Sequence, residues 1–331
     1  MKKILAFFIA LLILNAVTVY AQTMSNNGYP SNYDISVNPA ILSVNNMLSI
    51  SFSDLGLNYG ENNDGLIPSI NNNYLDTDNG FIDGGKISIT NTYQDLYINA
   101  DFSYYSANDT FNGYGQSISG AVTDPQTTYA PFSETSSNKI YDFNLKLGYM
   151  FPVTSKFVLT PYGEMGYNMW NRGDNTAQYA HYSNWSAIAG ILAQYAITRK
   201  LVADADLSYG TTFDAKSEEG DIASGGAYYC QNTISSCVPS AIDEDSIVFD
   251  LGSKPTYGIS GGLDYRFNNT VHVFGNINYK RVEYGQSSAV GLVPTYVYNN
   301  GVLVSQIPNS YTEPNSVTNE IIYSVGIGFS F

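Results

Sequence analysis

The side chains that could carry out chemistry in this sequence are two histidines and a set of carboxylates. Hydrolysis by an activated water needs a base within hydrogen-bond reach of the proton that it takes. Asp204 and Asp206 are two positions apart and share one face of a strand, and His181 lies near Asp174 in a long polar connection. No Asp-x-His pair, HExxH motif, Walker loop or dinucleotide fingerprint occurs. The sequence therefore predicts a protein that is not an enzyme and has no cofactor.

Most charged residues of the predicted strands alternate with apolar residues and therefore point to one side. Buried charges must be paired and hydrogen-bonded, so we expect an ion-pair network that fills the interior of a closed sheet. His272 follows a short turn and should face the same interior as a hydrogen-bonded side chain. The expected members of the network are Asp101, Asp142, Lys146, Glu164, Asp204, Asp206, Asp264, Arg266 and Lys280, with Lys86 facing them.

The two cysteines, Cys230 and Cys237, lie close together in the sequence C-Q-N-T-I-S-S-C. An exported protein meets an oxidising compartment, so we expect a local disulfide that closes a loop. A metal site is the weaker alternative because neither histidine is near in sequence. The short acidic run Asp243–Asp245 does not have the spacing of a known calcium loop, so no metal is predicted.

These side chains must be positioned by strands, and the last segment shows the pattern most clearly. In residues 320–331 apolar residues alternate with mostly small or polar ones, as in a strand with one apolar face. The apolar face consists of Ile321, Tyr323, Val325, Ile327, Phe329 and Phe331. Similar segments recur through the chain, and the pattern predicts an all-β fold, a transmembrane antiparallel up-and-down barrel.

Short and long connections alternate between the predicted strands, which is typical of outer-membrane barrels with short periplasmic turns and long outer loops. We expect ten strands and five long extracellular loops, with twelve or eight strands as alternatives. Twelve would follow if the hairpin around Asn299-Asn300-Gly301 entered the bilayer. The first strand, within Met47–Tyr59, loses its alternation between Phe52 and Leu55, which indicates a bulge or a late start. The long links are 61–85, 106–139, 171–183, 214–255 and 285–319.

The N-terminus has the pattern of a secretory signal peptide. Lys2 and Lys3 precede an apolar run, and Val19-Tyr20-Ala21 fits a cleavage site. We therefore expect a signal peptide at 1–21, a periplasmic segment at 22–46 and a barrel at 47–331. The chain has 29 tyrosines, which suit membrane interfaces, and its formal net charge of -15 argues against binding nucleic acid.

The chain resembles the small outer-membrane β-barrel superfamily that includes opacity-type and OmpA-type surface proteins. The resemblance rests on the signal peptide, the aromatic-ended last strand and segments such as Thr160–Tyr167, with Trp170 and Arg172 just beyond. It implies that the barrel-assembly machinery reads the last strand through Tyr323, Val325, Ile327, Phe329 and Phe331. The omptin proteases are also similar in export and expected strand number, and they need an Asp pair across the outer mouth from an Asp–His pair. Here Asp204 and Asp206 lie near the short turn Thr198–Lys200, at the expected periplasmic end, and no Asp-x-His pair occurs.

From these patterns we expect a surface protein of a Gram-negative outer membrane that is not an enzyme. Its partners would be outer-membrane lipid and the assembly machinery. A ligand or host surface could bind the loops, which are rich in Tyr and small polar residues. Its roles would be membrane architecture and contact or adhesion, as for a surface antigen. The first alternative is a narrow, porin-like channel that prefers cations, and the second is an omptin-like aspartyl/histidine protease.

Overall fold

The computed structural model describes residues 36–331 apart from 122–123, 175–178, 232 and 301. For residues 115–127, 221–245, 292–295, 305 and 307–309 it describes the backbone alone. The predicted signal peptide at 1–21 and most of the predicted periplasmic segment at 22–46 lie outside the described residues. Within those residues, no helix is long and apolar enough to cross a membrane.

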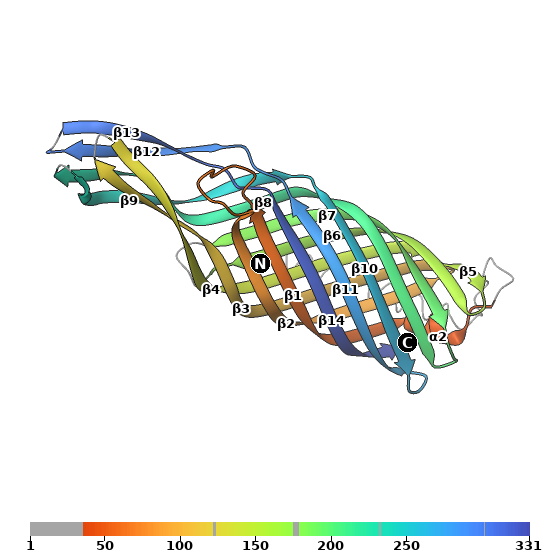
Figure 1. The fold of residues 1–331 in the computed structure, drawn as a ribbon. Coiled ribbons are helices and arrows are strands. Elements are labelled where there is room, and N and C mark those ends of the chain that lie inside the picture. The colour runs from red at the N-terminus through yellow and green to blue at the C-terminus, as the bar shows by residue number, and fades with distance from the viewer. Residues whose placement is uncertain (1–35, 122–123, 175–178, 232, 301) are drawn as a thin grey trace.

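Ten antiparallel strands form a closed barrel (Figure 1). Each strand pairs with its neighbours around the wall, and the pairing of β8 with β10 closes the ring. The predicted all-β fold and strand number are therefore confirmed. In order around the barrel, the strands are β1 (Met47–Asn62), β2 (Tyr74–Tyr93), β3 (Leu96–Ala121), β4 (Asp124–Tyr149), β6 (Phe157–Arg172), β7 (Ala180–Ala196), β8 (Leu201–Gln231), β10 (Pro255–Arg266), β11 (Val271–Tyr284) and β14 (Ser316–Ser330).

Four further strands lie outside this ring. The short β5 (Phe151–Thr154) pairs with β6 at one end of the barrel. β9 (Thr233–Gly252), β12 (Val290–Asn299) and β13 (Val302–Tyr311) project from the other end (Figure 1). We call this second end the hairpin end. The hairpin of β12 and β13 stands beyond the barrel and adds no strand to the wall, which excludes the twelve-strand alternative.

The predicted long links are largely strands rather than irregular loops. β3 and β4 pair continuously up to Ala121 and Asp124, and β8 continues to Gln231 against β9. Three hairpins thus project past the barrel, and β12 joins β8 through a parallel pairing of Tyr296–Asn299 with Ala227–Cys230. The links are long and polar as predicted, and much of their length continues the strands, because a strand that leaves an apolar environment can carry polar side chains on both faces.

The first strand contains no bulge at the point where its alternation changes. β1 keeps a continuous register with β14 and β2 from Met47 to Glu61. Leu55, Leu57 and Tyr59 instead face inward and are almost fully buried, whereas Asp54 faces outward. The predicted bulge was wrong because this part of the interior is itself apolar, so an apolar side chain does not mark the outer face.

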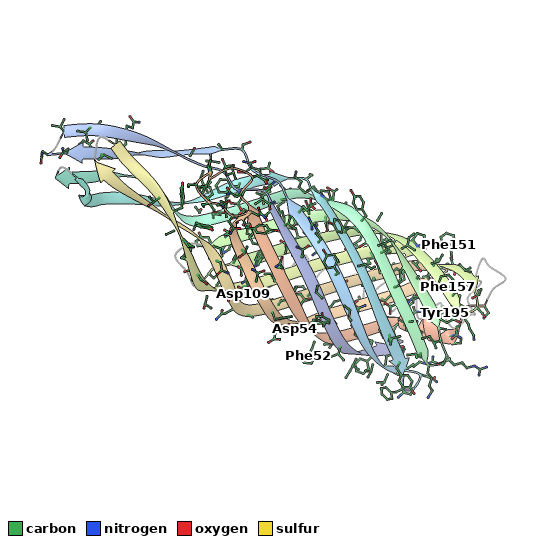
Figure 2. All side chains as sticks on the ribbon, viewed as in Figure 1. Phe52, Asp54, Asp109, Phe151, Phe157 and Tyr195 are labelled. Carbon is green, nitrogen blue, oxygen red and sulfur yellow. The ribbon has the colours of Figure 1, made fainter. Side chains whose placement is uncertain are left out.

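The outer surface of the barrel carries a broad band of exposed apolar side chains (Figure 2). Paired rings mark both edges of this band: Tyr104 with Tyr141 and Tyr167 with Trp185 towards the hairpin end, and Tyr149 with Phe151 at the opposite end. An apolar band between two aromatic girdles is the surface expected of a barrel in a bilayer. The outward residues of β14 belong to this band: Tyr323, Val325, Ile327 and Phe329, with Phe331 just beyond the strand.

Candidate functional site

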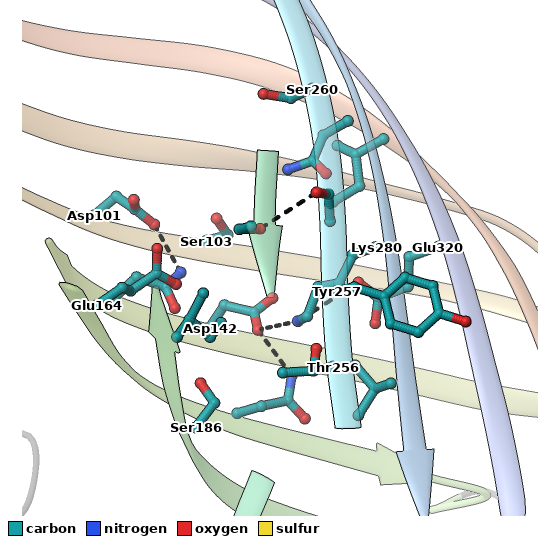
Figure 3. Close-up of a pocket in the computed structure, with 18 of the residues that line it drawn as sticks. Asp101, Ser103, Asp142, Glu164, Ser186, Thr256, Tyr257, Ser260, Lys280 and Glu320 are labelled. Carbon is teal, nitrogen blue, oxygen red and sulfur yellow. Dashed lines mark hydrogen bonds and ion pairs between the residues drawn. The ribbon is translucent and has the colours of Figure 1, made fainter. Parts of the chain in front are cut away.

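The middle of the barrel holds a small chamber between three lysine side chains and their carboxylate partners (Figure 3). Its volume is about 160 Å³. Lys146 Nζ lies 3.3 Å from Glu164 and 3.6 Å from Asp206, and Lys86 Nζ lies 3.5 Å from Asp101. On the other side, Lys280 Nζ lies 3.4 Å from Asp142 and 3.7 Å from Glu320. We call this chamber and its ion pairs the lumen chamber.

The structure places the other predicted network residues differently. Asp204 faces the lumen beside Gly262 and forms no ion pair with a described side chain. Asp264 binds His272 rather than a lysine. Arg266 lies at the exposed end of β10 and donates to the backbone oxygen of Arg199 over 3.1 Å. It does not join the lumen ion pairs, because β10 ends at Arg266 and its side chain turns along the rim. Glu320 was missed by sequence reasoning, although it lies in the last strand, β14, on the same face as Ile322 and Ser324.

A short helix closes the end of the barrel opposite the hairpins. Helix α2 (Pro39–Val44) begins with an Asn38 cap and a proline in its first turn, a common way to start a helix. Its Ala40 and Ile41 are buried against Met150 and Val158. Asn45, just after the helix, exchanges two side-chain hydrogen bonds with Gln194 of β7. We call this helix the plug.

A buried histidine fastens the plug to the wall. His272 Nε2 lies 2.8 Å from Ser43 Oγ of the plug and 2.6 Å from Ser330 Oγ, while Nδ1 lies 2.6 Å from Asp264 Oδ1. This order of serine, histidine and aspartate resembles a nucleophile with its base. However, His272 is 0% exposed and its Nε2 is shared by two hydroxyls, so a substrate has no approach to it. These hydrogen bonds join four elements, α2, β10, β11 and β14, and hold the plug against the barrel wall.

Beyond the aromatic girdle at the hairpin end, a second cluster fills the interior. Arg172 is its cation: Nη2 lies 3.4 Å from Glu61 and Nη1 lies 3.7 Å from Asp76. The Arg172 guanidinium also lies over the Tyr59 ring, 4.9 Å from its centroid. Tyr182 donates to Glu313 over 2.9 Å. We call this group the mouth cluster; it comprises Glu61, Asp76, Asp78, Asp109, Arg172, Tyr182, Glu219 and Glu313.

Carboxylates outnumber cations in the mouth cluster, and this changes their protonation. Burial, reinforced by the nearby Glu61 charge, holds the pKa of Asp76 and of Glu313 well above the usual range. Burial together with a hydrogen bond shared with Asp78 raises the pKa of Asp109 to about 9. Apart from a proton held by Asp109, no described group donates a hydrogen bond to the buried carboxyl oxygens of Asp78. With a pKa of about 9, the Asp109 carboxyl is neutral at pH 7.

Apolar and aromatic side chains pack around the mouth cluster and complete the closure of this end. The rings of Trp170 and Tyr182 stack with centroids 5.3 Å apart, and Tyr59 meets the edge of Trp170 at 5.0 Å. Leu55 and Leu57 belong to the same core. The barrel interior is thus closed by the plug at one end and by this core at the other, with the lumen chamber between them.

The predicted protease residues do not converge on one site. His181 Nε2 lies 2.8 Å from Asp174 Oδ1, but this pair lies on the outside with Lys139, and hydrogen bonds from Lys139 and His181 lower the pKa of Asp174. Asp206 accepts from Tyr162 inside the lumen chamber. Gly258–Gly262 fits the pattern GxSxG, but Ser260 lies within β10 rather than at a strand-to-helix turn. Neither histidine reaches the mouth acids.

The predicted disulfide is not described at the level of side chains. Cys230 lies next to the last residue of β8, and Cys237 lies in β9. Their neighbours Tyr229 of β8 and Val238 of β9 are paired in the strand register. The side chains of both cysteines, and those of Asp243–Asp245, lie outside the described residues, so the disulfide stays a prediction. Among the side chains that are described, no group of three or more potential ligands could hold a metal ion.

No family model and no curated protein matches the chain. Solved structures match its fold. The outer membrane protease OmpT from Escherichia coli aligns with a TM-score of 0.50 at 10% identity, covering 87% of this chain and 97% of OmpT. The chain has the fold of an outer-membrane β-barrel.

Two more distant outer-membrane proteins also align. The toluene transporter TodX of Pseudomonas putida aligns with a TM-score of 0.31 at 10% identity, covering 89% of this chain and 92% of TodX. The attachment invasion locus protein Ail of Yersinia pestis has a TM-score of 0.27 at 10% identity, covering 86% and 99%. At 10% identity the OmpT match shows the fold alone.

Proposed function

We propose that this chain is an integral protein of a bacterial outer membrane, not an enzyme, whose hairpins make contact at the cell surface. The apolar band between two aromatic girdles supports the membrane location. On this placement the plug faces the periplasm and the hairpin end faces outward. The barrel would contribute to membrane architecture, and the hairpins would supply the contact surface.

The closed interior is the observation that carries this proposal. A channel needs a continuous polar path, but the plug buries Ile41 at one end and the packed rings of Tyr59, Trp170 and Tyr182 fill the other. In the lumen chamber the lysines are held by carboxylates from several strands. The narrow cation-preferring channel is therefore the weaker alternative. The omptin-like protease is weaker still, because no histidine faces the mouth acids.

The projecting hairpins offer a surface suited to contact. In β13, Val302, Leu303 and Val304 are all exposed, and within the described residues β13 pairs with β12 alone. A strand with one free edge and exposed apolar side chains can accept another extended segment or an apolar surface. This arrangement supports a role in adhesion to a host, a matrix or a neighbouring cell.

Shortening this hairpin should separate contact from barrel assembly. Replacing 293–308 with Asn-Gly would close the hairpin at the existing pair of Leu292 and Asn309. We expect cells displaying the shortened protein to lose most of the wild-type retention on coated surfaces and most of their clumping. The amount of folded barrel, measured by heat-dependent gel mobility, should stay unchanged. Wild-type adhesion with the shortened hairpin would contradict a contact role for β12 and β13.

A further inference from the structure

Two carboxylates lie on the outer face of the barrel, within the apolar band. Asp54 of β1 and Asp83 of β2 are directly opposite each other in the strand register. Their outward neighbours are apolar: Phe52 is 79% exposed and Phe81 is 68% exposed (Figure 2). A strand needs roughly 9–11 residues to cross a bilayer. Counted from Met47 at the start of β1, Asp54 lies within this stretch, in the half nearer the hairpin end. Both side chains therefore face an apolar surrounding.

This placement is unfavourable without a cation. Like charges directly opposite each other in a sheet repel, and ionised groups in a bilayer are costly unless paired. Asp54 Oδ1 is buried and accepts no hydrogen bond from the protein. The nearest lysine in sequence, Lys86, points into the lumen and pairs with Asp101. Within the described residues, no cationic side chain forms an ion pair with either carboxylate.

A groove in the outer wall begins at these carboxylates. It has a volume of about 950 Å³ and crosses β10, β11, β14, β1 and β2. The outward glycines Gly261 and Gly275 lower its floor, because neither presents a side chain where the neighbouring strands present leucine, isoleucine or valine. Its walls are mainly Phe52, Leu263, Ile277, Tyr323 and Val325. The groove is therefore a hydrocarbon-lined trough with a pair of carboxylates at one edge.

We propose that this groove binds a lipid that carries a primary ammonium group, with the ammonium between Asp54 and Asp83 and a hydrocarbon chain along the glycine floor. The inference rests on the membrane location proposed above. A calcium ion fits less well, because it needs six to eight oxygen ligands and no third ligand is grouped with these two among the described side chains. A primary ammonium has three donors, enough to reach both carboxylates at once.

Lipid retention by the purified, refolded protein in neutral detergent tests this site. Phosphatidylethanolamine and phosphatidylcholine with the same acyl chains would be added separately, and bound lipid counted by native mass spectrometry. We expect phosphatidylethanolamine to be retained about tenfold more strongly, because the quaternary ammonium of phosphatidylcholine has no donor. Equal retention of the two lipids would overturn the proposal.

Two variants separate the headgroup from the chain. Asp54→Asn with Asp83→Asn should remove the preference, whereas the charge-matched pair Glu134→Gln with Glu218→Gln, at exposed positions beyond the band, should keep it. Gly261→Leu with Gly275→Leu should weaken retention of both lipids by filling the floor, since a Cβ at either position meets only a backbone oxygen at 3.6–3.7 Å. An unchanged preference of the Asn variant for phosphatidylethanolamine would contradict a lipid site. So would a wild-type dimer that becomes a monomer in the Asn variant, because the groove would then bind a second copy of the chain.

Discussion

Replacing Arg172 with methionine is expected to destabilise the barrel by about 3–5 kcal/mol at pH 7, the range for breaking a buried ion pair from one side. Arg172 is the cation facing Glu61 and Asp76, and its loss leaves these acids buried without compensation. The free energy of unfolding, from urea titration of the protein refolded in lipid vesicles, measures the effect. The damage should begin at the hairpin end, where limited proteolysis would cut first.

Two comparisons distinguish a charge effect from a packing effect. Arg172→Lys keeps the charge but loses the planar stacking over Tyr59, so it should recover part of the stability. Acidification should reduce the difference in stability between wild type and Arg172→Met, because Asp76 and Glu313 have raised pKa values and become neutral as the pH falls. A methionine variant within about 0.5 kcal/mol of wild type at pH 7 would contradict this account of the mouth cluster.

Replacing Asp109 with asparagine is expected to stabilise the protein at about pH 8 by roughly 1–3 kcal/mol and to change little at about pH 5. The pKa of Asp109 is about 9 in the folded protein and near its ordinary value of 3.8 when unfolded. The folded state therefore binds the proton more tightly, and its stability falls as pH rises from about 4 to about 9. The asparagine amide at position 109 is neutral at every pH, so this fall in stability with rising pH should disappear.

The asparagine also preserves the local hydrogen bonds. Asp109 Oδ1 accepts from Asn138 over 2.6 Å, and an amide oxygen can do the same. Its NH₂ group can donate to the buried oxygens of Asp78. Asp109→Ala, which does neither, should be less stable than wild type at both pH values. An Asp109→Asn protein with the same pH dependence as wild type would show that Asp109 is not the group responsible.

The barrel wall could be predicted from the sequence because membrane-facing strands obey a strict two-residue period. β3 and β14 carry that period without interruption, from Leu96 to Tyr104 and from Ile321 to Phe329. The same rule failed in β1, where Leu55 faces inward and Asp54 outward. In a membrane barrel an apolar residue usually faces lipid, but next to an apolar interior core it can face inward. The sequence of one strand alone does not show which of its faces is the interior one.

The mouth cluster and the plug could not be found in this way, since both depend on contacts between distant segments. Arg172 meets Glu61 over 111 positions of the chain, and Ser43 meets His272 over 229. Two local signals were present nonetheless. Asn38-Pro39 is a typical helix start, and Asp76-Thr-Asp78 places two acids on one face of a strand. Neither signal identifies the partner across the barrel.

Single-channel recording of the refolded protein in a planar bilayer tests the central claim most directly. With the plug seated on His272 and the mouth packed by Tyr59, Trp170 and Tyr182, we expect a folded barrel that is electrically silent. Heat-dependent gel mobility of the same sample would show that it is folded. The absence of conductance from a folded barrel would agree with a closed interior and with the hairpins as the contact surface. Steady, cation-selective openings of the wild-type protein would contradict the closed interior and make the lumen carboxylates of Asp142 and Glu164 its functional groups.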